Sequence, residues 1–300
     1  MIEVALMIEG QDGLTWDAWR RIARIAEDGG FAGLFRSDHF YNPNPPEKAS
    51  LECWISLAWL ASHTSRIEFG PLVSPMSFRD PRLLARQAAA VDDLSGGRLL
   101  VGLGAGWQER EHKAFGYDLL ERGPRFARYR DGVQVVSLLL HGDEPVSFKS
   151  DYFPLGGAIL LPRPKQKVRI VIGGNGPRRT LGLAAQFADE WNCTYQTPHG
   201  FRELSAALDA RLAERGREPR EVKRTMMTGI ILGRDSAELE QRLAGRSAES
   251  MRARGALVGS PAELREQLAE LEAAGLQRVM LQWLWLDDFE GMQALGKAVC

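Results

Sequence analysis

The chain has 300 residues, of which 44% are hydrophobic and 26% charged, a composition typical of a globular protein. Its net charge of −1 gives no electrostatic reason to expect nucleic acid or an anionic membrane as a partner. No apolar stretch reaches the roughly 18–20 residues of a membrane span, and the N-terminus lacks the pattern of a secretory signal. Cys53, Cys193 and Cys300 are odd in number and widely spaced, as in a reducing compartment. We therefore expect a cytoplasmic protein.

Short apolar runs alternate with amphipathic stretches along the whole chain. The runs predict eight β-strands, at Val4–Ile8, Gly33–Arg36, Ile67–Val73, Leu99–Leu103, Val168–Ile172, Glu190–Cys193, Thr225–Leu232 and Val279–Trp283. Strands that alternate with helices form a parallel sheet, and a count of eight favours a closed barrel over an open, doubly wound sheet. The sequence therefore predicts one α/β domain over residues 1–300, folded as a (β/α)₈ TIM barrel.

Capping signals mark several of the helices between these strands. The first helix is predicted to end at Gly29-Gly30, since glycine is a common C-terminal stop. Three N-terminal caps are predicted, at Ser50, at Asp80 before Pro81, and in the capping box Ser260–Glu263.

One stretch breaks the alternation, between the fourth and fifth barrel units. A helix over about 122–140 is followed by His141–Lys167, with prolines at 145, 154, 162 and 164. Within this insertion, Val146–Phe148 and Tyr152-Phe153 are predicted to pair as a small hairpin. A loop of this length either covers part of a site or is an ordinary surface excursion, and the sequence leaves both open.

In a (β/α)₈ barrel, functional groups gather in the loops that follow the strands. Small, polar or aromatic residues follow five of the predicted strands, at Ser37-Asp38-His39, Ser74-Pro75, Gly104-Ala105-Gly106-Trp107, Gly173-Gly174-Asn175-Gly176 and Trp283-Leu284-Trp285. Glycine at 102, 104 and 106 leaves the backbone of the fourth strand bare, which marks close approach of another backbone or a ligand. We interpret this segment as part of a cofactor site, with a simple strand-to-helix turn as the structural alternative.

His39 is the best acid–base candidate, because imidazole titrates near neutral pH. The adjacent Asp38 would raise its pKa or bind the same ligand. The alternative is a histidine at a helix start with no chemical role. The other histidines have no partner at metal-ligand spacing, so no metal site is predicted.

The turn Gly173–Gly176 runs into a helix that begins with Arg178 and Arg179. Cations at this position oppose the helix dipole, so local rules disfavour them. A phosphate would explain the pattern, because it suits both the backbone N–H groups of a helix start and a guanidinium group. An exposed arginine pair of small electrostatic cost is the alternative.

In this order, these residues resemble the luciferase-like monooxygenase superfamily, most of all its coenzyme F420-dependent oxidoreductase branch. The resemblance extends over nearly the whole chain. It is carried by Gly30-Phe31 through Ser37-Asp38-His39, Thr64–Gly70, Arg79-Asp80-Pro81, Asp93–Arg98, Gly104–Trp107 with Glu111, Phe115-Gly116, Ile172–Gly174 and Ala188-Asp189. It implies a TIM barrel with an insertion after the fourth strand and a flavin or deazaflavin across the C-terminal mouth.

The resemblance also implies roles for single residues. The ring would stack on a bulge in the third strand, often a non-proline cis peptide, near Leu72-Val73-Ser74. Asp38 and His39 would face the ring. Gly104, Ala105, Gly106 and Trp107 would line the ring and substrate pocket. The phosphate would be held by Gly173, Gly174, Asn175, Gly176 and Arg178.

Trp107 departs from the family pattern, because the deazaflavin sugar-phosphate dehydrogenases carry a glutamate acid/base at this place. An aromatic wall suits an apolar or planar substrate better than a sugar. Our leading hypothesis is hydride transfer between coenzyme F420 and a small, non-sugar organic substrate, with His39 and Trp107 as the catalytic residues. The alternatives are an FMN-dependent monooxygenase that uses O₂ and a separate flavin reductase, and a barrel that binds a ligand without turnover. Superfamily members commonly dimerise, which makes a homodimer one option.

Overall fold

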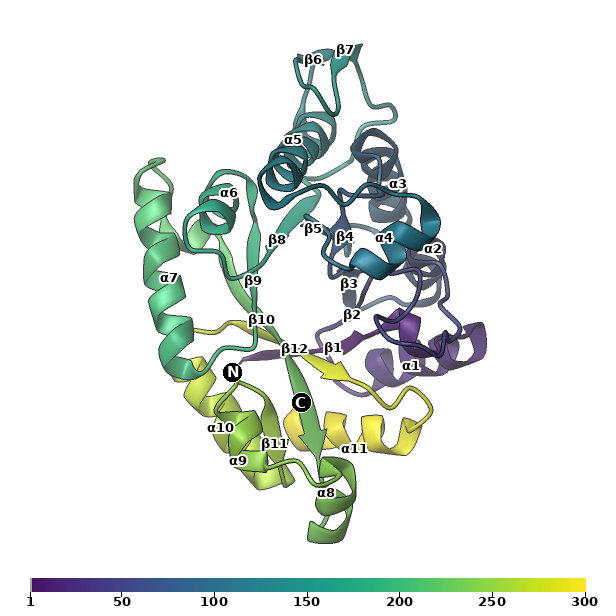
Figure 1. The fold of residues 1–300 in the computed structure, drawn as a ribbon, viewed down its shortest axis with the longest axis vertical. Coiled ribbons are helices and arrows are strands. Elements are labelled where there is room, and N and C mark those ends of the chain that lie inside the picture. Colours follow the sequence, from purple (N-terminus) through teal and green to yellow (C-terminus); the bar gives the residue numbers. More distant parts are fainter. Residues whose placement is uncertain (1) are drawn as a thin grey trace.

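The computed structural model describes residues 2–300, and Met1 lies outside them. A barrel of parallel strands forms its centre (Figure 1). In hydrogen-bonding order the strands are β3 (Glu68–Pro71), β2 (Gly33–Arg36), β1 (Glu3–Ile8), β12 (Arg278–Trp283), β10 (Lys223–Leu232), β9 (Glu190–Thr194), β8 (Arg169–Gly173), β5 (Leu100–Gly104) and β4 (Ser74–Pro75). β3 and β4 are two parts of one interrupted strand, so the sheet begins and ends on the same segment. The predicted TIM barrel is confirmed; that residues 1–300 form one domain stays a prediction.

The barrel closes where β3 meets β5. Phe69 and Leu99 form an isolated parallel bridge there, and the Phe69 amide donates to the Arg98 carbonyl oxygen at 3.2 Å. A Cβ atom at Gly70 would lie only 1.9 Å from the carbonyl oxygen of Leu100. Glycine at position 70 therefore permits the close approach that completes the ring of strands.

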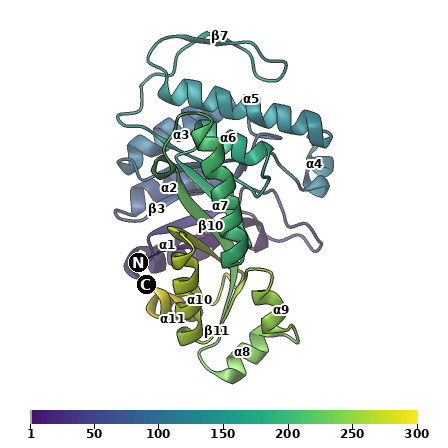
Figure 2. The ribbon, with the colours of Figure 1, turned by 90° about the vertical axis from the view of Figure 1, so that its left-hand side faces the viewer.

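Helices surround the strands and cover their outward faces (Figure 2). They are α1 (Trp16–Asp28), α2 (Cys53–His63), α3 (Pro81–Ser95), α4 (Glu109–Phe115), α5 (Arg122–His141), α6 (Arg179–Phe187), α7 (Pro198–Ala213), α8 (Ser236–Leu243), α9 (Ala248–Arg252), α10 (Pro261–Ala273) and α11 (Phe289–Val299). A short strand, β11 (Leu257–Gly259), pairs with the end of β10 outside the barrel. No helix within residues 2–300 is long and apolar enough to cross a membrane.

Most of the predicted helix ends are confirmed. Gly29 ends α1, the Asp80 side chain caps α3, and Ser260 forms the capping box of α10. The cap predicted at Ser50 is wrong, because α2 begins at Cys53 and its cap is Glu52. The Arg36 guanidinium holds the Leu51 carbonyl oxygen at 2.6 Å, which keeps the chain out of the helix up to this point.

The insertion after β5 contains the predicted hairpin, with one strand misplaced. β6 (Val146–Phe148) pairs with β7 (Leu155–Ala158), not with Tyr152-Phe153. Those two residues form the turn, because the Ser150 hydroxyl accepts both of their backbone N–H groups at 3.0 Å. The hairpin lies beyond α5, away from the barrel (Figures 1 and 2). The insertion is therefore a surface excursion.

Charged side chains fill the end of the barrel at which the strands begin. They come from the starts of six strands: Glu3, Glu68, Arg169, Glu190, Lys223 and Arg278. Arg278, with its side chain only 2% exposed, bonds to Glu190 at 3.0 Å, to Glu3 at 2.8 Å and to Glu68. We call this group the basal ion cluster.

Candidate active site

A cavity of about 570 Å³ opens at the mouth of the barrel, where the strands end. Its lining comes from the ends of β1, β2, β5, β8, β9 and β12, from the middle of β10 and from the break between β3 and β4. Of the residues predicted from the sequence, it brings together His39, Val73, Gly104, Ala105, Gly106, Trp107 and Gly173. Leu284 also lines it, whereas its neighbours Trp283 and Trp285 pack against each other outside the cavity.

His39 is held at the wall of this cavity by a buried carboxylate. Its Nδ1 lies 2.8 Å from Oε1 of Glu111, whose side chain is only 1% exposed. The other carboxylate oxygen of Glu111 accepts the Phe40 amide at 3.0 Å. This arrangement fixes the imidazole ring and leaves its Nε2 without a partner among residues 2–300. Nε2 is therefore the atom that can exchange a proton with a ligand.

The surroundings of His39 favour its charged form. Burial lowers the pKa of His39, but the hydrogen bond and the charge of Glu111 outweigh it. Glu9 and Asp38 add smaller contributions in the same direction. The pKa of His39 therefore lies above the value of about 6.5 usual for histidine.

Asp38 and Ser74 do not line the cavity. The Arg79 guanidinium binds both carboxylate oxygens of Asp38, at 2.9 and 2.6 Å. Ser74 donates to the same carboxylate at 2.7 Å and accepts the indole N–H of Trp54 at 2.9 Å. Both side chains are thus engaged inside the wall, and direct contact of either with a cofactor stays a prediction.

The bare backbone of β5 makes room for the break in the third strand. A Cβ at Gly102 would lie 2.1 Å from the Pro71 carbonyl oxygen, and one at Gly104 would lie 2.3 Å from a methyl group of Val73. A Cβ at Gly173 on β8 would lie 3.2 Å from the other methyl group of Val73. The close approach expected at these glycines is therefore made by the protein itself. The Leu72–Val73 peptide is cis, as the family resemblance implied.

A polar network on the opposite wall was missed in the sequence. Glu9, which follows β1, accepts hydrogen bonds from the side-chain amides of Gln11, at 2.7 Å, and Gln282. Ser37 donates to Gln11, and Tyr195 donates to Gln282. The rule that loops after strands carry function would have pointed to Glu9 and Gln11, but nothing in their spacing marks them.

The glycine turn after β8 is braced from behind. The Asn175 side chain bonds to the backbone of Thr194 through both its amide nitrogen and its oxygen, at 2.8 and 2.9 Å. The indole N–H of Trp191 donates to the Gly174 carbonyl oxygen at 2.9 Å. Gly176 and Arg178 line a second cavity of about 510 Å³, which adjoins the first because both include Ala105 and Gly106.

Trp107 stands at the rim of the mouth. Its side chain is 60% exposed, and its ring meets that of His39 edge to face, with the centroids 5.6 Å apart. An exposed indole beside an acid–base group is a surface on which a flat or apolar ligand can pack.

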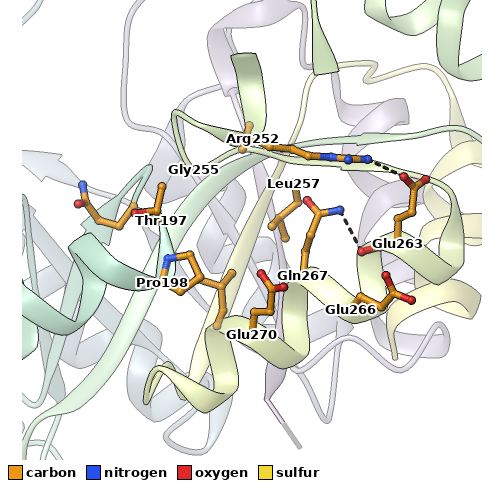
Figure 3. A pocket seen from close by; sticks show the side chains of 12 residues that line it. Thr197, Pro198, Arg252, Gly255, Leu257, Glu263, Glu266, Gln267 and Glu270 are labelled. Carbon is orange, nitrogen blue, oxygen red and sulfur yellow. Dashed lines mark hydrogen bonds and ion pairs between the residues drawn. The ribbon is translucent and has the colours of Figure 1, made fainter. Parts of the chain in front are cut away.

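A smaller cavity, of about 320 Å³, lies between the start of α7 and α10 (Figure 3). Two of its polar side chains are engaged within its wall: Arg252 pairs with Glu263 at 2.8 Å, and the Gln267 amide donates to the Glu263 carbonyl oxygen at 2.9 Å. In the described part of the chain, this cavity holds no buried polar atom without a partner. Residues 2–300 also contain no cluster of three His, Cys, Asp or Glu side chains that could hold a metal ion.

Comparison with known proteins identifies relatives of two kinds. The family model described as luciferase-like monooxygenase matches residues 4–250. The chain is 29% identical over 216 residues to an F420-dependent glucose-6-phosphate dehydrogenase of Kineococcus radiotolerans, a match to 71% of this chain and 63% of that relative. It is 28% identical over 288 residues to the pyrimidine monooxygenase RutA of Stutzerimonas stutzeri, covering 83% and 78% of the two chains. The chain thus matches less than two thirds of the length of the dehydrogenase.

Among solved structures, the fold resembles that of an F420-dependent secondary alcohol dehydrogenase in complex with an F420–acetone adduct. The TM-score is 0.86, and the match covers 99% of this chain and 98% of the other. Because only 20% of the residues are identical, this likeness shows the fold alone.

Proposed function

The chain belongs to the luciferase-like monooxygenase family, and from this premise we propose that it transfers hydride between coenzyme F420 and a small, non-sugar organic substrate. Relatives named as dehydrogenases and as monooxygenases both support oxidoreductase chemistry for this chain. The observation that carries the proposal is the His39–Glu111 pair, which presents an anchored imidazole to the cavity. The cofactor and the substrate class are the parts of the proposal that need testing.

The lining of the cavity fits a planar heterocycle with polar groups along one edge. Leu72 and Val73 form an apolar platform, and Gly106, which has φ of +83° and no side chain, lines the cavity beside it. The carboxylate and amides of Glu9, Gln11 and Gln282 lie on the opposite side, where they can pair with ring N–H and C=O groups. A deazaflavin has this distribution of apolar and amide-bearing edges. FMN has it too, so the mouth alone does not choose between the two cofactors.

When bound, the deazaflavin supplies or accepts a hydride at its C5 atom. The side chains provide the rest. As the substrate carbon gains or loses hydride, its oxygen gains or loses a proton, and Nε2 of His39 exchanges that proton. Glu111 keeps the imidazole oriented and balances its positive charge. Trp107 packs against the substrate and limits the access of water.

The acid–base pair supports the deazaflavin more than FMN. Hydride transfer to or from an alcohol or carbonyl group needs one anchored proton donor or acceptor, and His39 meets this need. Trp107 supports a substrate other than a sugar phosphate. An indole offers no carboxylate to the hydroxyl groups of a sugar, whereas it packs well against an apolar or planar molecule.

Separate titrations of the purified protein with F420 and FMN test the cofactor. We expect F420 to bind at least tenfold more tightly than FMN, with binding of F420 monitored through its fluorescence. Tight binding of FMN without binding of F420 would overturn the proposal and favour the two-component monooxygenase, which needs a separate flavin reductase.

The variant His39→Asn tests the acid–base role. With F420 and a panel of small alcohols, ketones and enones, we expect kcat to fall about 10²–10⁴-fold, the usual contribution of general acid–base catalysis. The Kd for F420 should stay the same. His199→Asn, which changes an exposed histidine on α7, is the matched control. Equal kcat values for the two variants would remove His39 from the mechanism.

A further inference from the structure

The turn after β1 places two carboxylates in the lining of the mouth cavity. Glu9 precedes a short 3₁₀ helix, and Asp12 is the last residue of that helix. A Cβ at Gly10, where the helix begins, would lie 2.1 Å from the guanidinium group of Arg36. The chain can turn here because glycine leaves that space to the arginine. As a result, both carboxylates lie at the end of β1 and line the cavity.

The two carboxylates differ in what holds them. Glu9 accepts the side-chain amides of Gln11, at 2.7 Å, and Gln282. The carboxylate of Asp12 is half-buried, and within residues 2–300 it forms no hydrogen bond and no ion pair. Burial raises the pKa of Asp12, the charge of Lys48 lowers it and that of Glu9 raises it, and the net shift is upward. A cation beside Asp12 would therefore stabilise its charged form.

The mouth cavity contains carboxylates but no permanent cation. Among residues 2–300, no lysine or arginine lines it, and His39 is its one side chain that can become cationic near neutral pH. Glu9 lies close enough to His39 to contribute to the raised pKa of the imidazole. The arginines nearby line the second cavity instead, beyond Ala105 and Gly106. An anionic substrate in the mouth would therefore meet two carboxylates and only one imidazole, which is unfavourable at short range.

Trp107 is a second, independent group that favours a cation. Its indole is 60% exposed at the rim of the same cavity, beside His39. Among aromatic side chains, tryptophan attracts an ammonium group most strongly, through the negative face of its ring. A carboxylate without a partner and an exposed indole in one cavity are together suited to an amine. Neither of them attracts a phosphate or a carboxylate.

We propose that the substrate carries a positively charged amine nitrogen, which Asp12 binds while the reacting carbon lies against His39. The charge of Glu9 adds to the attraction, and Trp107 packs against the rest of the molecule. The inference rests on the proposed function and names the substrate class of the same site. The amine takes no part in the bonds that form and break, because it only orients the substrate. Asp12 is therefore a specificity-determining residue.

Calorimetric titration of the F420-loaded protein with three probes of similar shape tests this preference. The probes are benzylammonium, benzyl alcohol and benzoate, which are positive, neutral and negative at about pH 7. We expect benzylammonium to bind about tenfold or more tightly than benzoate, the usual gain from a hydrogen bond to a charged group. Asp12→Asn should remove most of this preference. The Kd of benzyl alcohol should stay the same, because the Asp12 carboxylate holds no other part of the protein. Asp12→Lys should reverse the preference and favour benzoate.

Asp17→Asn is the matched control, because Asp17 lies outside the cavity, on the surface of α1, and pairs with Arg20. It removes the same charge and should leave the affinities of all three probes unchanged. The inference is wrong if benzylammonium does not bind, if benzoate binds as tightly, or if the preference survives in Asp12→Asn. If F420 itself does not bind, the proposed function fails as well. Binding of F420 without a preference for the cationic probe overturns this inference alone.

Discussion

The two ends of the barrel treat charge in opposite ways. At the end where strands begin, the basal ion cluster places each carboxylate against a cation. The single side chain of Arg278 contacts all three carboxylates, those of Glu3, Glu68 and Glu190. At the end where strands end, Nε2 of His39 has no protein partner in the described part of the chain. The second cavity beside the mouth is lined by Arg122, Arg125, Arg178 and Arg179 and by no carboxylate. Compensated charge serves the protein alone, whereas uncompensated charge at a cavity is available to a ligand. The contrast agrees with the general division of (β/α)₈ barrels into a stabilising and a functional face.

The largest expected effect is at the basal ion cluster. Arg278→Met removes the shared cation and leaves the buried carboxylate of Glu190 without an ion-pair partner, whereas Glu3 keeps Lys223 and Glu68 keeps Arg169. An uncompensated buried charge of this kind should cost about 3–5 kcal/mol of unfolding free energy. Denaturant unfolding followed by tryptophan fluorescence measures this. Arg211→Met is the control, because its pair with Glu214 is partly exposed and worth about 0–1 kcal/mol. If the two variants unfold alike, the basal cluster contributes nothing special, and the comparison between the two ends fails.

Next in size is the packing of Val73 against the bare strand. Gly104→Ala places a methyl group where the side chain of Val73 already lies, and valine is stiff at χ1. We expect a loss of about 1–3 kcal/mol in stability and a weaker affinity for the cofactor, because the platform must shift. Calorimetry and fluorescence titration measure the two effects. Unchanged cofactor affinity would show that this platform does not support the ring.

Glu111→Gln sharpens the comparison at the mouth. Removing the charge of Glu111 lowers the pKa of His39, since burial then dominates. The pH range in which His39 is protonated should therefore shift to lower pH. In the reaction direction in which His39 donates the proton, kcat above pH 7 should fall roughly tenfold, which is part of the 10²–10⁴-fold that general acid–base catalysis contributes. Glu109→Gln, an exposed change on the same helix, should leave the pH profile unchanged.

The same pair makes a linked prediction for stability. A histidine whose pKa is raised in the folded state stabilises fully below its unfolded pKa, about 6.5, and loses this contribution as pH rises through the folded pKa. The native protein should therefore exceed Glu111→Gln in stability by more at pH 6 than at pH 9. A difference that grows toward high pH would contradict the assignment of the charge.

The smallest effect is expected on the outer surface of α6. A Cβ at Gly182 would meet no atom within 4 Å, so Gly182→Ala should stabilise the helix by about 0.4–1 kcal/mol. Thermal unfolding measures the gain, and cofactor binding should not change. A loss of stability would contradict the prediction and would mean that the extra methyl group disturbs the packing or backbone of α6.

Apolar runs made the barrel predictable, because each of the eight strands is buried and bounded by polar turns. Two local errors have a common origin. The cap at Ser50 and the strand at Tyr152-Phe153 followed good local rules, yet Arg36 and the hydroxyl of Ser150 imposed other geometries. Local propensity does not determine the structure where a side chain forms hydrogen bonds with the backbone of the segment, whether that side chain is distant in sequence, as Arg36 is, or nearby, as Ser150 is.

In the site, single residues were predictable and their partners were not. His39 and the glycines follow or end predicted strands, so they can be recognised from the sequence alone. The carboxylate of Asp38 belongs to Arg79, 41 residues further along the chain, and Glu111 reaches His39 across 72 residues. No spacing rule connects such pairs, since only the closed barrel brings them together. In the second cavity, Arg178 and Arg179 could be singled out from the sequence, whereas Arg122 and Arg125 of α5, which line the same cavity, could not.

Val73 has a further consequence for what the mouth can accept. Its two methyl groups occupy the space above Gly104 and Gly173, so the side chain sets how deeply any ligand can descend between β5 and β8. Val73 thus limits the depth of the mouth beside β5 and β8, while Trp107 forms an exposed part of its rim. A substitution of Val73 would change the depth of the cavity, and a substitution of Trp107 would change the width of its opening. Substrate range can therefore be redesigned along two independent axes, with the acid–base pair left in place.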